Sequence, residues 1–162
     1  AIVNPLQQTK DVYIHRNRFK EKELKEFSIL FLIMNNLDIF RKNIEFVSEI
    51  NFESKTTNEF KQKLIDYLLS EKFFERKKID INDFEKKFIA LIEEININAP
   101  VKIIYKDKSE EKIVSIFKEI ALEIKRIELQ EKIQFLEDKV SLNLDESLYS
   151  ELLSLRNQLK RE

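Results

Sequence analysis

The sequence predicts an all-α protein, with a helical bundle followed by a long helix and a C-terminal antiparallel helical hairpin. The 162 residues include no glycine and only two prolines, so few positions interrupt a helix. Apolar residues recur three and four positions apart along most of the chain, which is the period of one helix face. These patterns predict a linker or arm at residues 1–20, a bundle at 21–125, and a hairpin at 126–162 that shares the long helix with the bundle.

The composition excludes several kinds of site. Phosphate-binding loops, dinucleotide fingerprints and calcium loops need glycine where the backbone turns sharply or approaches a ligand closely. Cysteine is absent and His15 is the sole histidine, so disulfides and a Cys/His zinc site are excluded. No apolar run approaches the ~20 residues that cross a bilayer. We therefore expect a cytoplasmic protein without a metal, a cofactor or membrane contact.

The charges are unevenly distributed, although the net charge is −1. Residues 1–22 include five basic and two acidic residues, whereas residues 110–162 include nine basic and twelve acidic ones. Phosphate backbones attract basic surfaces. Any contact with nucleic acid is therefore expected to be weak and confined to the N-terminal arm, where basic residues flank Tyr13 and Phe19.

Four helices are expected before Pro100, where most of the phenylalanines lie. The first begins at Glu21, and Asp38 is the expected N-cap of the second. A third follows Ser54, Thr56 and Thr57, each a candidate N-cap, with Glu59 placed for a capping box with Thr56. The fourth is expected to start near residues 80–84 and to include Phe84. After it, residues 101–107 are the one candidate for a short strand.

The long helix is expected from Ser109 to Val140, with two apolar faces used in succession. At about 100° per residue, the early and late apolar residues fall on roughly opposite sides. The early face comprises Ile113, Ile116, Phe117, Ile120, Ile124 and Ile127, and the late face comprises Leu122, Leu129, Ile133, Leu136 and Val140. We expect the early face to pack on the bundle and the late face on another helix.

That other helix follows the turn SLNLDE, in which Asn143 and Glu146 are spaced like a capping box. Its leucines recur four, three and four positions apart, which is one helix face. Folding the chain antiparallel about residue 144 gives the expected seam pairs, which are Val140–Leu148, Leu136–Leu152, Ile133–Leu155 and Leu129–Leu159. The match in register predicts the hairpin.

Some apolar side chains of the hairpin lie off this seam. In one interpretation, Tyr149 and Leu153, which lie beside the leucine stripe, simply belong to a wider stripe, whereas Phe135 lies on the back of the long helix. In the alternative interpretation, some of the three face a partner. With the neighbouring cations Lys139 and Arg156, they are the candidate partner-binding residues. No catalytic residues are expected, because acidic pairs such as those at 93–94 and 110–111 are typical of solvated helix faces and no serine lies in a nucleophile elbow.

The C-terminal residues carry a resemblance to a known family. Residues 111–162, EKIVSIFKEIALEIKRIELQEKIQFLEDKVSLNLDESLYSELLSLRNQLKRE, resemble the end of bacterial DnaG-type DNA primases, in which a long helix precedes a short acidic turn and a leucine-rich last helix. ILFLIMNNLDIF at 29–40 is similar to the family's apolar run followed by Asn-His-Pro, although Asn36 and Leu37 stand where His and Pro are usual. INFESKTTNEFKQKLIDYLL at 50–69 resembles the next segment.

The resemblance spans residues 21–162 and implies a role in replication. In these primases the C-terminal domain is non-catalytic and binds the N-terminal domain of the replicative helicase, which brings primer synthesis to the fork. The zinc-binding and polymerase domains of such primases precede the part that this sequence resembles. The alternative is another helical adaptor domain, such as the helicase N-terminal domain itself, whose bundle architecture looks similar.

Overall fold

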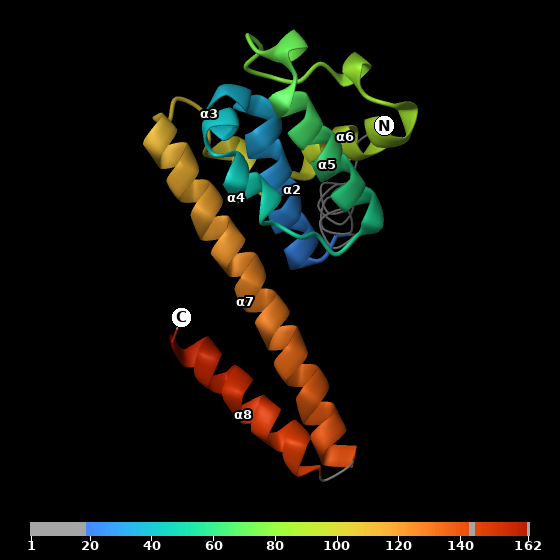
Figure 1. Cartoon of the computed structure of the whole chain (residues 1–162), viewed down its shortest axis with the longest axis vertical. Coiled ribbons are helices and arrows are strands. Elements are labelled where there is room, and N and C mark those ends of the chain that lie inside the picture. The colour runs from blue at the N-terminus through green and yellow to red at the C-terminus, as the bar shows by residue number, and fades with distance from the viewer. Residues whose placement is uncertain (1–18, 143–144, 162) are drawn as a thin grey trace, which may run out of the picture. The chain divides into compact units, whose positions relative to one another are not determined.

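The fold is all-α. The computed structural model describes residues 19–142 and 145–161, and all regular structure within them is helical, which confirms the predicted fold class (Figure 1). The α-helices are α2 (Glu21–Asn35), α3 (Leu37–Lys42), α4 (Ile44–Ser48), α5 (Lys55–Leu69), α6 (Lys86–Asn98), α7 (Glu110–Leu142) and α8 (Glu146–Arg161). Three 3₁₀ turns join them, namely η1 (Glu71–Phe73), η2 (Ile81–Asp83) and η3 (Pro100–Ile103).

Two compact units make up the chain, and the boundary lies inside α7, between Ile120 and Ala121. We call residues up to Ile120 the N-terminal unit and residues from Ala121 the hairpin unit. Helix α7 contributes its first turns to one unit and its remaining turns to the other.

The core of the N-terminal unit is built around α2, which is buried on nearly all sides from Phe27 to Met34. A helix that is apolar all round lies inside a fold rather than on its surface. Helix α2 packs against α3, α6 and η3. Rings from the other helices complete the core, because Phe40 contacts Phe117 with centroids 4.8 Å apart and Phe60 contacts Phe88 at 5.6 Å.

The N-caps of α3 and α5 differ in part from the sequence prediction. Asp38 does not cap α3, because the helix begins at Leu37, two residues before the start that an N-cap at Asp38 implies, and Asn36 is the N-cap. Leu37 is fully buried, so core packing sets this helix start. Ser54 does cap α5, since its hydroxyl accepts a hydrogen bond from the Thr57 N–H. The predicted box between Thr56 and Glu59 is wrong, because Thr56 already lies inside the helix.

The fourth predicted helix and the candidate strand are also corrected. Helix α6 begins at Lys86, so Phe84 lies before it, in extended backbone after η2. Residues 101–107 form no strand, because they begin with the η3 turn, which has Pro100 at its first position. The Val101 N–H donates to the buried Ser28 hydroxyl, and Lys102 Nζ donates to the Ile97 carbonyl at 2.6 Å. These contacts hold the segment as a turn against α2 and α6.

Asp107 lies in this turn with φ of 58°, the left-handed region that favours glycine. We expect Asp107→Gly to be nearly neutral, because relief of left-handed strain offsets the entropy that glycine adds to the unfolded chain. Asp107→Val is expected to cost about 1 to 3 kcal/mol, because a β-branched side chain is poorly tolerated at positive φ. Urea unfolding measures both. Equal stability of the Gly and Val variants would contradict the backbone conformation described.

The start of α7 and the first part of its early face agree with the prediction, whereas Ile124 and Ile127 of that face belong to the hairpin unit. The Ser109 hydroxyl accepts from the Lys112 N–H at 3.2 Å, which caps the helix. Ile113, Ile116 and Phe117 are buried, as expected of the face that serves the bundle. Leu122 was expected on the buried late face and is instead 59% exposed. It lies two turns before Leu129, beyond the last seam pair, so no described residue of α8 lies opposite it.

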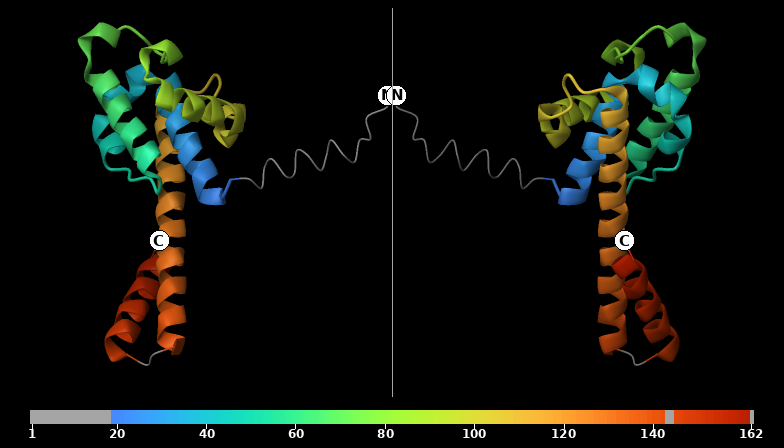
Figure 2. Two further views of the ribbon diagram at one scale, coloured as in Figure 1. Left: turned by 90° about the vertical axis from the view of Figure 1, so that its right-hand side faces the viewer. Right: turned by 90° about the vertical axis from the view of Figure 1, so that its left-hand side faces the viewer.

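The hairpin unit confirms the predicted seam. Helix α8 runs back along the later part of α7 (Figures 1 and 2). The apolar cluster between them contains the eight predicted residues, namely Leu129, Ile133, Leu136, Val140, Leu148, Leu152, Leu155 and Leu159. Asn143, the predicted N-cap, lies outside the described residues. At the start of α8, the Asp145 carboxylate accepts from the Ser147 N–H at 2.9 Å.

Candidate partner-binding surface

The three off-seam residues of the hairpin are all exposed. Phe135 is 58% exposed, Tyr149 50% and Leu153 41%, whereas Leu152, the neighbour of Leu153 on the seam, is 2% exposed. Exposed apolar side chains indicate a contact surface where they lie together in a patch. They therefore remain the candidate residues of this unit for binding a partner.

Phe135 is accompanied by a cation from its own helix. Lys139 lies four residues later, so it occupies the same face of α7. Its Nζ lies 4.4 Å from the centroid of the Phe135 ring. This is a cation–π contact on an exposed surface, which presents an apolar ring with a positive charge over it.

Arg156 joins the two helices of the hairpin. Its Nη2 lies 2.6 Å from Glu137 Oε1 of α7. The two side chains are 43% and 37% exposed, so the pair contributes at most about 1 kcal/mol. Its position is informative, because it shows which side of α8 lies next to which side of α7.

This ion pair divides the candidate residues between two faces of the hairpin. Tyr149 lies seven residues before Arg156, about 20° away around α8, and Leu153 lies about 60° away, so both share the Arg156 side. On α7, Phe135 lies about 160° from Glu137 and therefore on the opposite side. The structure thus groups Tyr149 and Leu153 with Arg156.

The second face carries Phe135 together with Lys139. Sequence reasoning placed Phe135 on the back of the long helix and Tyr149 and Leu153 beside the seam, but it named all five residues as one candidate set. The spacing of four between the phenylalanine and the lysine is a signal that predicts their contact. The ion pair between Glu137 and Arg156 could be found only after the register of the hairpin was known.

The face with Tyr149 and Leu153 is hollowed on both sides of Ser150. One open hollow of about 500 Å³ is lined by Val140, Asp145, Glu146, Tyr149 and Ser150. A second of about 580 Å³ is lined by Ser150, Leu153, Ser154, Asn157, Gln158 and Arg161. The hollows are acidic near the turn and basic near the end of α8. We call the surface formed by Tyr149, Leu153, Arg156 and these linings the α8 face.

The described residues of the chain provide neither a metal site nor a membrane-spanning helix. Within 19–142 and 145–161, no cluster of three histidine or acidic side chains is arranged to hold a metal ion. None of the described helices has the length and apolar character required to cross a membrane.

Comparison of the chain with protein-family models, with curated proteins and with solved structures gives no match. The fold and the candidate surface define a broad class of protein. It is an all-α chain with a bundle-like unit and a helical hairpin that exposes apolar residues.

Proposed function

We propose that this chain is a non-catalytic interaction domain of a bacterial DNA primase, and that it binds the N-terminal domain of the replicative helicase. The proposal rests on the resemblance of residues 21–162 to the C-terminal part of these primases. The single structural observation that supports it is the α8 face. There, Tyr149 and Leu153 are exposed beside Arg156 on a hairpin whose seam is already filled.

The chemistry of the α8 face suits a protein partner. Tyrosine and arginine are enriched among the residues that anchor interfaces, and they act best beside apolar neighbours that exclude water. Arg156 is held in place by Glu137 at 2.6 Å, so less side-chain entropy is lost when a partner binds. Binding to this partner would bring primer synthesis to the replication fork. The complex would be part of a primosome in the cytoplasm. The domain itself needs no cofactor, and nucleic acid contact is at most weak, through residues 1–20.

Titration of the chain with the purified helicase N-terminal domain tests the proposal. Tyr149→Ser and Leu153→Ser, made singly, are expected to cost about 2 kcal/mol or more where the residue is an anchor. This corresponds to a loss of affinity of roughly thirtyfold. Because both residues lie off the seam, thermal unfolding should change little. Isothermal titration calorimetry measures the affinity, and circular dichroism measures the melting temperature.

Two matched variants locate the contact. Phe135→Ser changes the opposite face of the hairpin, and Ile103→Ser changes an 82% exposed apolar residue of the N-terminal unit. We expect Ile103→Ser to bind as tightly as the unchanged chain. If only Ile103→Ser lost affinity, the contact would belong to the N-terminal unit and the assignment of the α8 face would be wrong. Absence of any binding by the unchanged chain would favour a helical adaptor of another kind.

A further inference from the structure

The segment between α5 and α6 has no buried residue. We call residues 70–85 the strap. It contains η1 and η2, and each of its side chains is exposed or only partly covered. Apolar burial is the dominant force that holds most segments of a fold in place. The strap must therefore be held mainly by polar and ring contacts.

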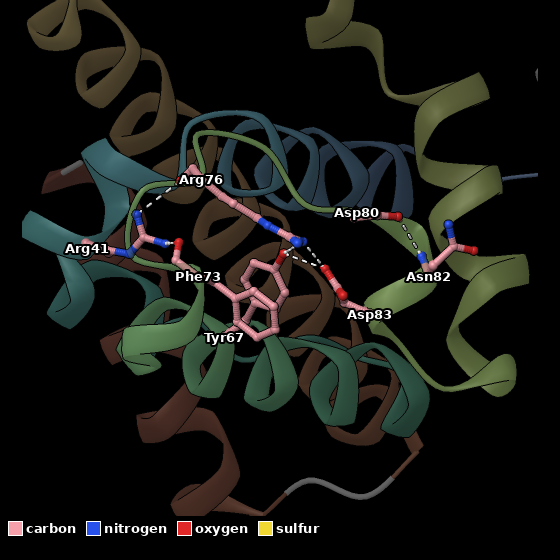
Figure 3. Close-up of polar contacts among 7 residues, drawn as sticks. All are labelled: Arg41, Tyr67, Phe73, Arg76, Asp80, Asn82 and Asp83. Carbon is pink, nitrogen blue, oxygen red and sulfur yellow. Dashed lines mark hydrogen bonds and ion pairs between the residues drawn. The ribbon is translucent and has the colours of Figure 1, made fainter.

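Arg41 of α3 makes several of these polar contacts. Its Nε donates to the carbonyl of Leu68 at 3.1 Å, and its Nη1 donates to the carbonyls of Phe74 at 2.9 Å and Arg76 at 3.1 Å. Its Nη2 donates to the Phe73 carbonyl, as Figure 3 shows. A guanidinium presents five N–H donors in a rigid plane. One side chain thus binds the end of α5 and three carbonyls of the strap.

Two backbone hydrogen bonds tie the strap to the same end of α2 and α3. The Leu37 N–H donates to the Lys77 carbonyl at 2.9 Å, and the Ile79 N–H donates to the Met34 carbonyl at 3.0 Å. Since Leu37 and Arg41 lie one turn apart on α3, these bonds and the guanidinium form one attachment.

A second attachment lies around Tyr67 of α5 (Figure 3). The Tyr67 ring stacks on Phe73 with centroids 3.9 Å apart, and its hydroxyl donates to Asp83 Oδ2 at 2.9 Å. Arg76 also binds Asp83, and its Nη1 donates to the Tyr67 hydroxyl at 3.0 Å. Burial, more than any other cause, raises the pKa of Tyr67 above its ordinary value. The hydroxyl therefore stays neutral near pH 7.

From these contacts we propose that the strap is a separately opening unit of the fold, latched by Arg41, which opens while the surrounding helices stay folded. Local units of this kind open when few apolar contacts hold them. Strap residues form one wall of a hollow of about 310 Å³, whose other wall consists of Lys63, Asp66 and Tyr67 of α5 and Phe88 of α6. Opening removes the strap wall and uncovers the aromatic side chains of α5 and α6. It also frees the basic residues of the strap for proteolysis. This is a conformational device independent of the helicase proposal.

Amide hydrogen exchange of the full chain tests the latch. In the unchanged protein, the N–H groups of Leu37 and Ile79 are expected to exchange through an opening that depends weakly on urea. The Leu64 N–H in α5 is expected to exchange only when the N-terminal unit as a whole unfolds, and this larger opening depends strongly on urea. If Leu37 and Ile79 exchanged with the same rate and urea dependence as Leu64, the strap would not open separately.

Variants of Arg41 then identify the latch. Arg41→Ala is expected to speed exchange at Ile79 at least tenfold, with little change at Leu64, and to speed tryptic cleavage after Lys77. Arg41→Lys should lie between, because one ammonium cannot hold all four carbonyls. The matched control is Lys42→Ala, which removes only an exposed ion pair with Glu110. If exchange at Ile79 were unchanged in both Arg41 variants, the proposed role of Arg41 would be wrong. It would also be wrong if exchange at Leu64 were accelerated as much as exchange at Ile79.

Discussion

Replacing Phe60 with alanine is expected to lower the free energy of unfolding of the N-terminal unit by about 3 to 5 kcal/mol. Phe60 has no exposed surface. Its ring contacts Phe84 at 5.5 Å and Phe88 at 5.6 Å between centroids. Truncation removes both ring contacts and leaves a cavity between α5 and α6 that a close-packed core cannot fully close.

Urea unfolding followed through amide signals of α5 measures this effect in the N-terminal unit alone. Phe60→Leu should cost less than Phe60→Ala, because leucine refills part of the cavity. Phe74→Ala is the control, since Phe74 is 69% exposed and surface substitutions usually change stability by less than about 0.5 kcal/mol. Similar costs for Phe60→Ala and Phe74→Ala would contradict the described core.

The second large effect concerns the hairpin seam. Leu152 is 2% exposed and is the one buried residue of α8 within the described chain. Leu152→Ala should therefore cost about 2 to 4 kcal/mol of local stability. The loss is expected in the hairpin unit, because an isolated helix of this length is marginal in water. Hydrogen exchange of α8 amides measures it, and Leu153→Ala, with its 41% exposed side chain, is the matched control.

A double-mutant cycle with Leu136 tests the register of the seam. If the two leucines are partners across it, the double variant should cost less than the sum of the single variants, because contacting residues are coupled. Leu129 lies two turns before Leu136 on the same seam, so Leu129→Ala should combine with Leu152→Ala more nearly additively. Additivity within experimental error for the first pair would show that the predicted pairing is wrong, although both residues belong to one cluster.

The elements that the sequence predicted correctly depend on period alone. The seam is one example, since leucines spaced four, three and four positions apart can face only one side of α8. Phe117 is another, because the early face of α7 follows from the same counting. Such patterns are local, and tertiary packing strengthens them rather than opposing them.

The errors lie where a distant contact decides the local structure. Asp38 is a good N-cap by residue type, but burial of Leu37 starts α3 earlier. Residues 101–107 have the composition of a strand, but Pro100 and the hydrogen bonds of the Ser28 and Lys102 side chains hold a turn there. Propensity is a weak prior that such contacts override.

The candidate surface was only partly accessible to sequence reasoning. Phe135, Tyr149 and Leu153 were named because they lie off the seam, and each is exposed. Their division between two faces needs the pairing of Glu137 with Arg156, which joins residues 19 positions apart. Arg41 gave no signal at all, because its acceptors are main-chain carbonyls, which every residue possesses.

That choice of acceptors has an evolutionary consequence. Because the hydrogen-bond acceptors of Arg41 are the main-chain carbonyls of Phe73, Phe74 and Arg76, substitutions at these three positions leave the acceptors in place. At this attachment the path of the strap is thus set by a residue 32 to 35 positions upstream, whereas Phe73, Arg76 and Asp83 are also constrained through their side chains at the Tyr67 attachment. Insertions and deletions are different, since they move the carbonyls out of reach of the guanidinium. Away from the residues that contact Tyr67, the strap should therefore tolerate changes of residue type far better than changes of length.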